Sequence, residues 1–481
     1  MLTALTAGAA SAATPFTPEQ LQYPYPSNAT YDYVPIIDQF TQLRADRPDI
    51  LTLNDSQTVA INQAATDLES ERAIIDQYDD MSVSMHDGMG ERVGAIYRDA
   101  RLAGELPKTQ ALLAKSGGLI GYHSSSNPAK QHFSYDRPYI RFPELLEYRD
   151  KDGGDAWAST SGAYPSGHTS QAYWQGTALA TMLPELAPQI LARTSEAGHN
   201  RIVMGAHYPL DVMSGRMMGQ HIVERRWSDP EFRVLLEEAS AELHTVLEAG
   251  CGVPLADCIA ADTPYLPEDE ALAAYEARLS YAFPQIAAAG QPVTVPENAE
   301  SLLLTSHPDL TPEQRRQVLA LTAIDSGYPL DEGTEGSWQR LDLAAAMAAD
   351  VTVAADGTVS LVAAPAPVDP TPAPEPEPGP APVDPAPGDP GTVPAPGEGD
   401  AGTDPVDTAP VAVEPAAPAG GAATGTAAGR DPQAVAPTAS GRDGLAYTGS
   451  DALLGVAGAA LALLGGGTAL VLRRRRASTR G

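Results

Sequence analysis

The chain has 481 residues with 30 basic and 62 acidic side chains, giving a formal net charge of −32. Because nucleic-acid binding needs a basic surface that displaces counterions, we expect no nucleic-acid partner. Twenty of the 44 prolines lie between residues 365 and 437, and no aromatic residue occurs between Trp338 and Tyr447. Such a segment has too few apolar side chains to offset its ordering entropy, so the foldable part ends near residue 360.

The first twelve residues are small and mostly apolar, and they end in Ala10-Ser11-Ala12. This pattern resembles the last part of a secretory signal peptide with an A-x-A cleavage site, although a basic start is missing. We interpret residues 1–12 as the remnant of a signal peptide, which predicts export. The alternative is an alanine-rich, disordered start.

Residues 13–300 are expected to form a helical domain, because apolar residues recur there at spacings of three and four. The clearest runs are Ser56–Ile75, Ser170–Met182, Glu185–Thr194, Asp211–Glu224 and Asp229–Leu247. Residues 301–362 continue this region as a C-terminal extension. Within it, the alternating segment Val351–Val362 predicts a β-hairpin that turns at Asp356-Gly357. The sequence therefore predicts an all-α fold with one short hairpin.

Three short segments of the helical region combine cations, histidines and a carboxylate. They are Lys130–Pro138, Pro165–His168 and Asn200–Asp211. Lys130, Arg137 and Arg201 can neutralise the charge of a phosphate group, the arginines through a bidentate fork. Brought together, the three segments would form a site for a tetrahedral dianion.

The second and third segments also supply the groups that a transfer reaction needs. Ser166 is a good helix N-cap, and Gly167 lets the free backbone amides of that helix approach phosphate oxygens. Asp211 lies four residues after His207, so one helical turn can bring its carboxylate to the imidazole. The carboxylate would fix the tautomer and leave the other ring nitrogen free to attack phosphorus. His168 would then protonate the leaving oxygen.

The three segments match the patterns K-x6-R-P, P-S-G-H and S-R-x5-H-x3-D, with Asn200 in place of the leading serine. This set resembles the signature of the type 2 phosphatidic acid phosphatase superfamily. The chain is similar to exported bacterial class A nonspecific acid phosphatases over residues 25 to 250. The resemblance implies an all-α bundle of the acid phosphatase and vanadium haloperoxidase type, with a phosphohistidine intermediate, phosphomonoester substrates, no cofactor and no metal.

On this sequence the resemblance makes His207 the nucleophile, Asp211 its orienting carboxylate and His168 the general acid. It assigns phosphate binding to Lys130, Arg137, Ser166, Gly167 and Arg201. Two alternatives remain open. One is a vanadium-dependent haloperoxidase, which binds vanadate through the equivalent histidine, and the other is a non-catalytic binding protein displayed on the cell wall.

The chain has only two cysteines, Cys251 and Cys258. In an exported protein, two cysteines this close predict a disulfide that closes a short loop. The alternative is a pair of free thiols. We expect no metal role for them, because no histidine lies near enough in sequence to join them.

Residues 363–444 are rich in proline, alanine and acidic side chains, which predicts an extended, disordered stalk. Residues 445–481 then combine Leu445-Ala446-Tyr447-Thr448-Gly449, an uncharged apolar run over 452–472 and four arginines. The run is long enough for a transmembrane helix, and the arginines would keep the tail in the cytoplasm.

This order resembles a Gram-positive cell-wall sorting signal of the LAxTG type, a variant of LPxTG. The resemblance implies that a sortase cleaves between Thr448 and Gly449 and joins the chain to peptidoglycan. The protein would then be exported and anchored to the cell wall, touching the membrane only through this segment before sorting. The alternative is a simple membrane tail anchor with the domain facing outward.

Overall fold

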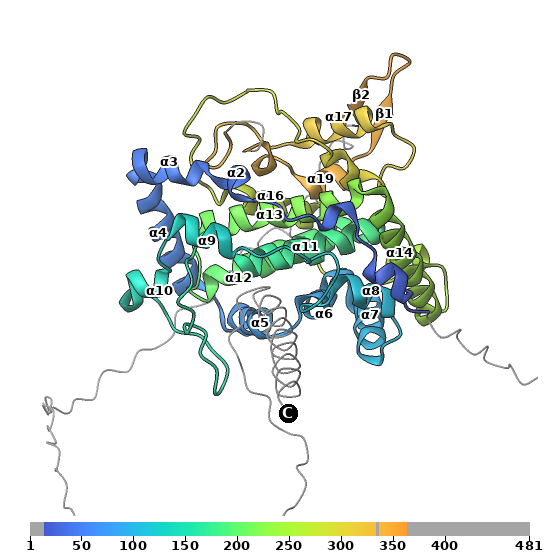
Figure 1. The fold of residues 1–481 in the computed structure, drawn as a ribbon, viewed down its shortest axis with the longest axis horizontal. Helices are drawn as coiled ribbons and strands as arrows, with labels where there is room; N and C mark the ends of the chain where they lie inside the picture. The colour runs from blue at the N-terminus through green and yellow to red at the C-terminus, as the bar shows by residue number, and fades with distance from the viewer. Residues whose placement is uncertain (1–13, 333–335, 363–481) are drawn as a thin grey trace, which may run out of the picture. The chain divides into compact units, whose positions relative to one another are not determined.

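The computed structural model describes residues 14–332 and 336–362, and these residues are predominantly helical, as the sequence predicts (Figure 1). The predictions for residues 1–12, the stalk, Thr448, Gly449 and the apolar run 452–472 lie outside the described residues. Within the described ranges, none of the helices combines the length and the apolar character needed to cross a membrane.

Three long helices lie side by side at the centre of the fold (Figure 1). They are α11 (Gly167–Met182), α12 (Ala187–Val203) and α13 (Pro209–Ser228). All sixteen residues of α11 are buried. Glycines allow this close packing, because a Cβ on Gly219 of α13 would lie 2.4 Å from the Cβ of Tyr173 in α11.

The chain before the central helices forms mostly short helices. They are α1 (Pro18–Gln22), η1 (Pro26–Asn28), α2 (Val34–Ile37), α3 (Gln39–Asp46), α4 (Pro48–Ala64), α5 (Asp67–Tyr78), α6 (Met81–Ser84), η2 (Met85–Met89), α7 (Glu91–Ala103), α8 (Pro107–Leu113), α9 (Asn127–Phe133), α10 (Pro138–Arg141) and η3 (Pro143–Leu145). Figure 1 shows α5 to α8 on one side of the central helices.

The run Ser56–Ile75 is helical, as its spacing predicts, but the structure divides it between α4 and α5. Ala65 adopts an extended conformation after α4, and Thr66 starts a new helix as its N-cap. The Thr66 hydroxyl accepts a hydrogen bond from the backbone amide of Glu69, and the Glu69 carboxylate accepts one from the amide of Thr66. This capping box satisfies the free amides at the start of α5 and fixes the break.

The short helix η4 (Pro184–Leu186) connects α11 and α12. The chain after the central helices begins with α14 (Pro230–Cys251), which follows α13. Asp229 caps α14 by accepting hydrogen bonds from the amides of Glu231 and Phe232. The predicted disulfide between Cys251 and Cys258 is present and joins the end of α14 to α15 (Leu255–Ala260).

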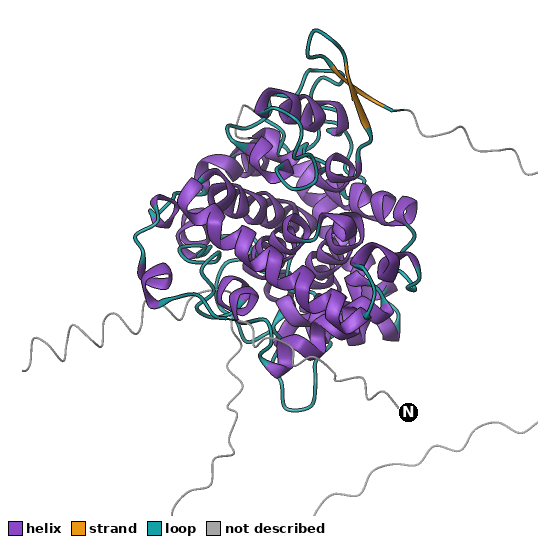
Figure 2. Cartoon of the chain, turned by 90° about the vertical axis from the view of Figure 1, so that its right-hand side faces the viewer, coloured by secondary structure: helices purple, strands orange, loops and turns teal. Residues whose placement is uncertain are grey.

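The remaining described elements are α16 (Glu268–Ser280), η5 (Ala299–Leu303), α17 (Pro312–Thr322), η6 (Ser337–Gln339), α19 (Leu343–Ala348), β1 (Val351–Val353) and β2 (Val359–Leu361). The predicted hairpin is confirmed, since β1 and β2 pair antiparallel with Thr352 opposite Ser360. Figure 2 shows this hairpin as a small strand pair at the edge of a helical body. Trp338 and Leu343 from this part of the chain are buried in the same hydrophobic core as the central helices.

Candidate active site

The three motif segments meet at one end of the central helices. Lys130 lies in α9, and Arg137 immediately precedes α10. Ser166, Gly167 and His168 form the start of α11, whereas Arg201 lies in the last turn of α12. His207 lies just before α13, and Asp211 lies in its first turn. All eight of these residues are buried, so the sequence-predicted set is brought into one desolvated cluster.

His207 and Asp211 form a hydrogen-bonded pair, as their four-residue spacing predicts. The His207 Nδ1 lies 3.0 Å from the Asp211 Oδ2, which also accepts a hydrogen bond from the Tyr208 amide. Because this amide fixes the carboxylate, the imidazole is held with Nδ1 toward Asp211. On the other side of the ring, Nε2 lies 3.0 Å from Arg137 Nη1. Arginine only donates, so Nε2 accepts this hydrogen bond and carries a lone pair rather than a proton.

Arg137 is held by the loop that precedes α11. Its Nε donates to the carbonyl of Ser161 at 2.9 Å, and its Nη2 donates to the Ser161 hydroxyl at 3.0 Å. Lys130 Nζ donates to the neighbouring carbonyl of Gly162 at 2.6 Å. The backbone of residues 161–162 therefore orients two cations of the cluster at once.

Ser166 is the N-cap of α11, as the sequence predicts. Its hydroxyl accepts a hydrogen bond from the Thr169 amide at 3.2 Å, and its own amide donates to the Asp211 carbonyl at 3.0 Å. A Cβ on Gly167 would lie 2.8 Å from the Ser126 hydroxyl, so only glycine fits without displacing a neighbour. The next residue, His168, has a buried Nε2 without a hydrogen-bond partner among the described residues.

Arg201 approaches the cluster from α12 and is oriented by a residue of α5. Its Nη1 donates a hydrogen bond to the side-chain oxygen of Gln77, while its Nε is buried and has no partner in the described part of the chain. A guanidinium with a free Nε can still donate to an incoming anion. Gln77 itself is buried.

The electrostatics of the cluster favour an anion. Burial lowers the pKa of His207 well below its usual value, and the charges of Arg137, Lys130 and Arg201 lower it further. Burial also lowers the pKa of Arg201 to about 9, with Arg137 as the next cause. Because mutually repelling cations gain most from a bound anion, a phosphate dianion would relieve the repulsion among these groups.

His168 and Asp211 respond to the same burial. The pKa of His168 lies well below its usual value, first because of burial and then because of Arg201 and Lys115. Burial raises the pKa of the Asp211 carboxyl to about 7, although the Tyr208 amide and the charge of Lys130 oppose the rise. The cluster therefore contains neutral imidazoles when it holds no anion.

Asn200 occupies the position of the motif serine, but its side chain binds a residue of α5 instead of a residue of the cluster. Its side-chain amide donates to the Asp76 carboxylate at 2.8 Å, and the same carboxylate accepts two hydrogen bonds from Arg193. The amide at this position therefore joins α12 to α5.

A pocket of ≈ 470 Å³ lies beside the cluster and is lined by polar side chains together with Lys130 and Ser161. Its other polar lining residues are Asn127, Gln131, Ser134, Tyr135, Asp136 and Thr160. No group of three or more His, Cys, Asp or Glu side chains in the described ranges is arranged to hold a metal ion. The donors that converge at this site are cations and amides, which suit an oxyanion.

Sequence reasoning missed three residues that the structure places against the cluster. Gln77 holds Arg201, Ser161 holds Arg137, and the charge of Lys115 acts on His168. None of them lies inside a recognisable motif. The contacts of Gln77 and Ser161 join segments that lie far apart in the sequence, so no spacing could have indicated them.

Comparisons with known proteins agree with the motif reading. Residues 111–230, which contain all eight predicted site residues, match the PAP2 superfamily model. The non-specific acid phosphatase of Salmonella typhimurium is 29% identical over 140 residues, which cover 29% of this chain and 54% of that protein. The acid phosphatase of Zymomonas mobilis is 33% identical over 116 residues, covering 24% of this chain and 42% of that protein.

A third relative, the non-specific acid phosphatase of Providencia stuartii, is 36% identical over 118 residues, which cover 24% of this chain and 46% of that protein. The chain thus spans about half the length of the curated relatives it matches. Residues 111–230 therefore carry a PAP2 superfamily domain, and the chain is homologous to bacterial non-specific acid phosphatases.

Proposed function

We propose that this protein is an acid phosphatase that hydrolyses phosphate monoesters through a phosphohistidine intermediate. The observation that carries the proposal is the arrangement of His207, with Nδ1 against Asp211 and Nε2 beside Arg137. A neutral imidazole with a fixed tautomer and a lone pair among cations suits attack on phosphorus. The homology to acid phosphatases supports the same reaction class.

In the first step, Nε2 of His207 attacks phosphorus, a P–N bond forms, and the bond from phosphorus to the ester oxygen breaks. Lys130, Arg137 and Arg201 stabilise the equatorial oxygens, together with the free amides at the start of α11. Arg137 Nη1 must first turn from His207 Nε2 to the phosphate, because one hydrogen atom serves only one strong acceptor. Asp211 stabilises the charged imidazole that results.

His168 completes the proton balance. A bound dianion raises the pKa of His168, which the surrounding cations otherwise lower, so His168 can hold the proton that the leaving oxygen takes up. In the second step, His168 removes a proton from water, the oxygen attacks phosphorus and the P–N bond breaks. Inorganic phosphate then leaves, and both histidines return to their starting states.

Hydrolysis of p-nitrophenyl phosphate by the purified protein tests this proposal. Activity that survives EDTA, with competitive inhibition by vanadate, is the expected result, because vanadate adopts a five-coordinate shape like that of the transition state. Loss of activity on chelation and its return with a divalent ion would reject the metal-independent mechanism. Bromide oxidation after vanadate loading would indicate the haloperoxidase alternative, and binding without turnover would indicate a non-catalytic wall protein.

We also propose that the enzyme is exported and attached to peptidoglycan by a sortase after cleavage between Thr448 and Gly449. The support is the sequence order of pentapeptide, apolar run over 452–472 and four arginines. Mass spectrometry of wall digests is expected to find Thr448 amide-linked to a peptidoglycan stem peptide. An intact C-terminus in the membrane fraction would show a tail anchor instead, without affecting the catalytic proposal.

A further inference from the structure

Two consecutive residues of α5 each bind an arginine of α12, and they do so with different charges. Asp76 pairs with Arg193 through two hydrogen bonds, from Nη1 at 2.9 Å and from Nη2 at 2.8 Å. Gln77 accepts a hydrogen bond from Arg201, two helical turns later in α12. One arginine therefore meets a carboxylate, whereas the other meets a neutral amide.

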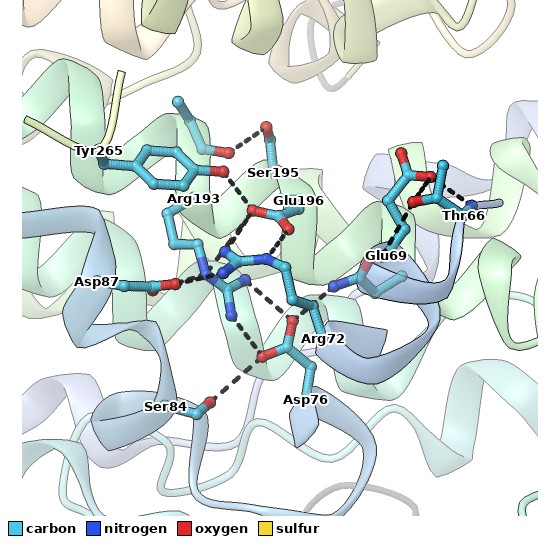
Figure 3. Close-up of polar contacts among 12 residues, drawn as sticks. Thr66, Glu69, Arg72, Asp76, Ser84, Asp87, Arg193, Ser195, Glu196 and Tyr265 are labelled. Carbon is cyan, nitrogen blue, oxygen red and sulfur yellow. Dashed lines mark hydrogen bonds and ion pairs between the residues drawn. The ribbon is translucent and has the colours of Figure 1, made fainter. Parts of the chain in front are cut away.

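The carboxylate side of this contact is a partly buried ionic network, shown in Figure 3. Arg193 also donates to Asp87 at 2.9 Å, and Arg72 of α5 bridges Asp87 and Glu196 of α12. Arg193 and Asp76 are almost fully buried. Loss of either partner of the Arg193–Asp76 pair would leave a buried charge without compensation. The network therefore fixes α5 against α12.

The neutral side of the contact lies at the candidate active site. Arg201 is buried, and no ion pair joins it to a carboxylate within residues 14–332 and 336–362. A buried arginine usually has a carboxylate partner, because an unpaired buried charge is costly. Here the Gln77 amide oxygen orients the guanidinium, and the positive charge stays available to a ligand.

Resting on the phosphatase function proposed above, we propose that Gln77 is a positioning residue whose neutral amide aligns Arg201 for the phosphate dianion without neutralising it. A carboxylate at this position would hold Arg201 at least as firmly, but it would compete with phosphate for the same charge. Asp76 precedes Gln77 in α5 and is bound by Arg193 and Asn200 of α12. These contacts fix the turn of α5 that carries Gln77.

The charge-changing variant Gln77→Glu separates positioning from a purely structural role. It forms an ion pair with a buried arginine that otherwise lacks one, so its thermal unfolding midpoint is expected to equal or exceed that of the wild type. Its inhibition constant for inorganic phosphate and its KM for p-nitrophenyl phosphate are expected to rise by roughly ten- to hundredfold. A structural role alone predicts that affinity and stability change together.

A matched control exists in α13. Arg216 donates to the Gln220 side-chain oxygen at 3.2 Å, and both residues are buried. Gln220 lies nine residues after Asp211, about 14 Å along the helix axis. Gln220→Glu therefore places the same new charge beside a buried arginine away from the site, and its phosphate inhibition constant is expected to stay within about twofold of the wild type.

The outcomes distinguish this inference from the proposed function. Wild-type protein that neither hydrolyses p-nitrophenyl phosphate nor binds phosphate would reject both. An active wild type, with a folded Gln77→Glu variant of unchanged phosphate inhibition, would overturn the positioning role alone. If Gln77→Glu does not fold, the neutral variant Gln77→Met decides, since loss of the hydrogen bond is expected to raise the inhibition constant about threefold or more, and no rise would overturn the inference.

Discussion

The central helix α11 and the outer helix α14 have very different environments. All sixteen residues of α11 are buried, whereas only seven of the 22 residues of α14 are buried. The buried side chains of α14 recur at helical spacing, as in Leu236, Leu243 and Leu247. α11 is instead buried on every side, and its buried residues include polar side chains such as Gln171 and Gln175.

The difference shows two ways of stabilising a helix within one chain. An apolar stripe is enough for α14, because its other face stays in water. The central helices have no solvent face, so they depend on glycines that allow close approach and on polar groups that find partners. The candidate site lies at the ends of these central helices, where the polar groups are already desolvated.

The largest expected difference between the central helices and α14 is the effect on activity of replacing His207 or His244. His207→Ala removes the proposed nucleophile from the central layer, so kcat for p-nitrophenyl phosphate is expected to fall by roughly 10⁴-fold or more. Rapid-quench trapping should then detect no phosphoenzyme. His244 of α14 is partly exposed and bonds to Glu185, so His244→Ala is expected to stay within about twofold of wild-type activity. Substantial turnover by purified His207→Ala would reject the mechanism.

Two glycine substitutions test the same difference between central and outer helices through the free energy of unfolding. A Cβ on Gly219 of α13 would lie 2.8 Å from the carbonyl oxygen of Ser170 and closer still to Tyr173, so the central helices must move apart. Gly219→Ala is expected to lower the free energy of unfolding by about 3 kcal/mol, measured by urea denaturation.

The outer counterpart is Gly250 of α14, where the three atoms nearest to a Cβ all belong to Ile96 of α7, with Cγ2 at 2.5 Å. Because Gly250 is exposed and Ile96 is only partly buried, the two helices can shift locally at this contact, so Gly250→Ala is expected to cost about 1 kcal/mol or less, part of it offset by the better helix propensity of alanine. Equal losses in the two variants would show that the central helices tolerate separation as readily as α14 does.

The same contrast explains how far the sequence predicts this fold. The spacing of apolar residues predicted α14 well, because one face of this helix is buried and the other is exposed, which leaves a helical period in the sequence. The division between α4 and α5 was missed, although Thr66 and Glu69 have the spacing of a capping box. The motif residues of the site were found by spacing and by resemblance. Gln77 and Ser161 were not, because contacts between distant segments leave no periodic signal.

A third test uses the pH dependence of the free energy of unfolding. A central and an outer histidine are expected to change this free energy in opposite directions as the pH rises. Burial lowers the pKa of His199 in α12 to about 4, and its Nδ1 has no partner among the described residues. The unfolded chain binds a proton below pH 6.5, while the folded chain keeps His199 neutral until about pH 4. The stability that His199 contributes is therefore present above pH 6.5 and lost as the pH falls toward 4.

His199→Gln removes this titration, so the slope of unfolding free energy against pH between 4 and 6.5 is expected to fall by about 1.4 kcal/mol per pH unit. The pKa of His244 is raised by its hydrogen bond to Glu185, so its contribution is present below pH 6.5 and lost as the pH rises through the folded value. His244→Gln is thus expected to weaken the fold slightly at low pH. Parallel slopes in wild type and His199→Gln would contradict the burial of this ring.

The smallest expected effect concerns Asn200, where the chain departs from the family motif. The Asn200 amide donates to Asp76 at 2.8 Å and so contributes to the contact between α5 and α12. Serine is too short to keep this hydrogen bond, so Asn200→Ser is expected to lower the free energy of unfolding by about 1 kcal/mol. Thr245→Ala on the exposed face of α14, which loses only a hydrogen bond to its own helix, is expected to cost less than about 0.5 kcal/mol.

The second measurement on the Asn200→Ser variant is its affinity for phosphate. Because the amide is engaged with Asp76, which also holds Arg193, restoring the motif serine is expected to leave KM for p-nitrophenyl phosphate within about twofold of the wild type. A gain in affinity of tenfold or more would mean that a hydroxyl at this position reaches the phosphate.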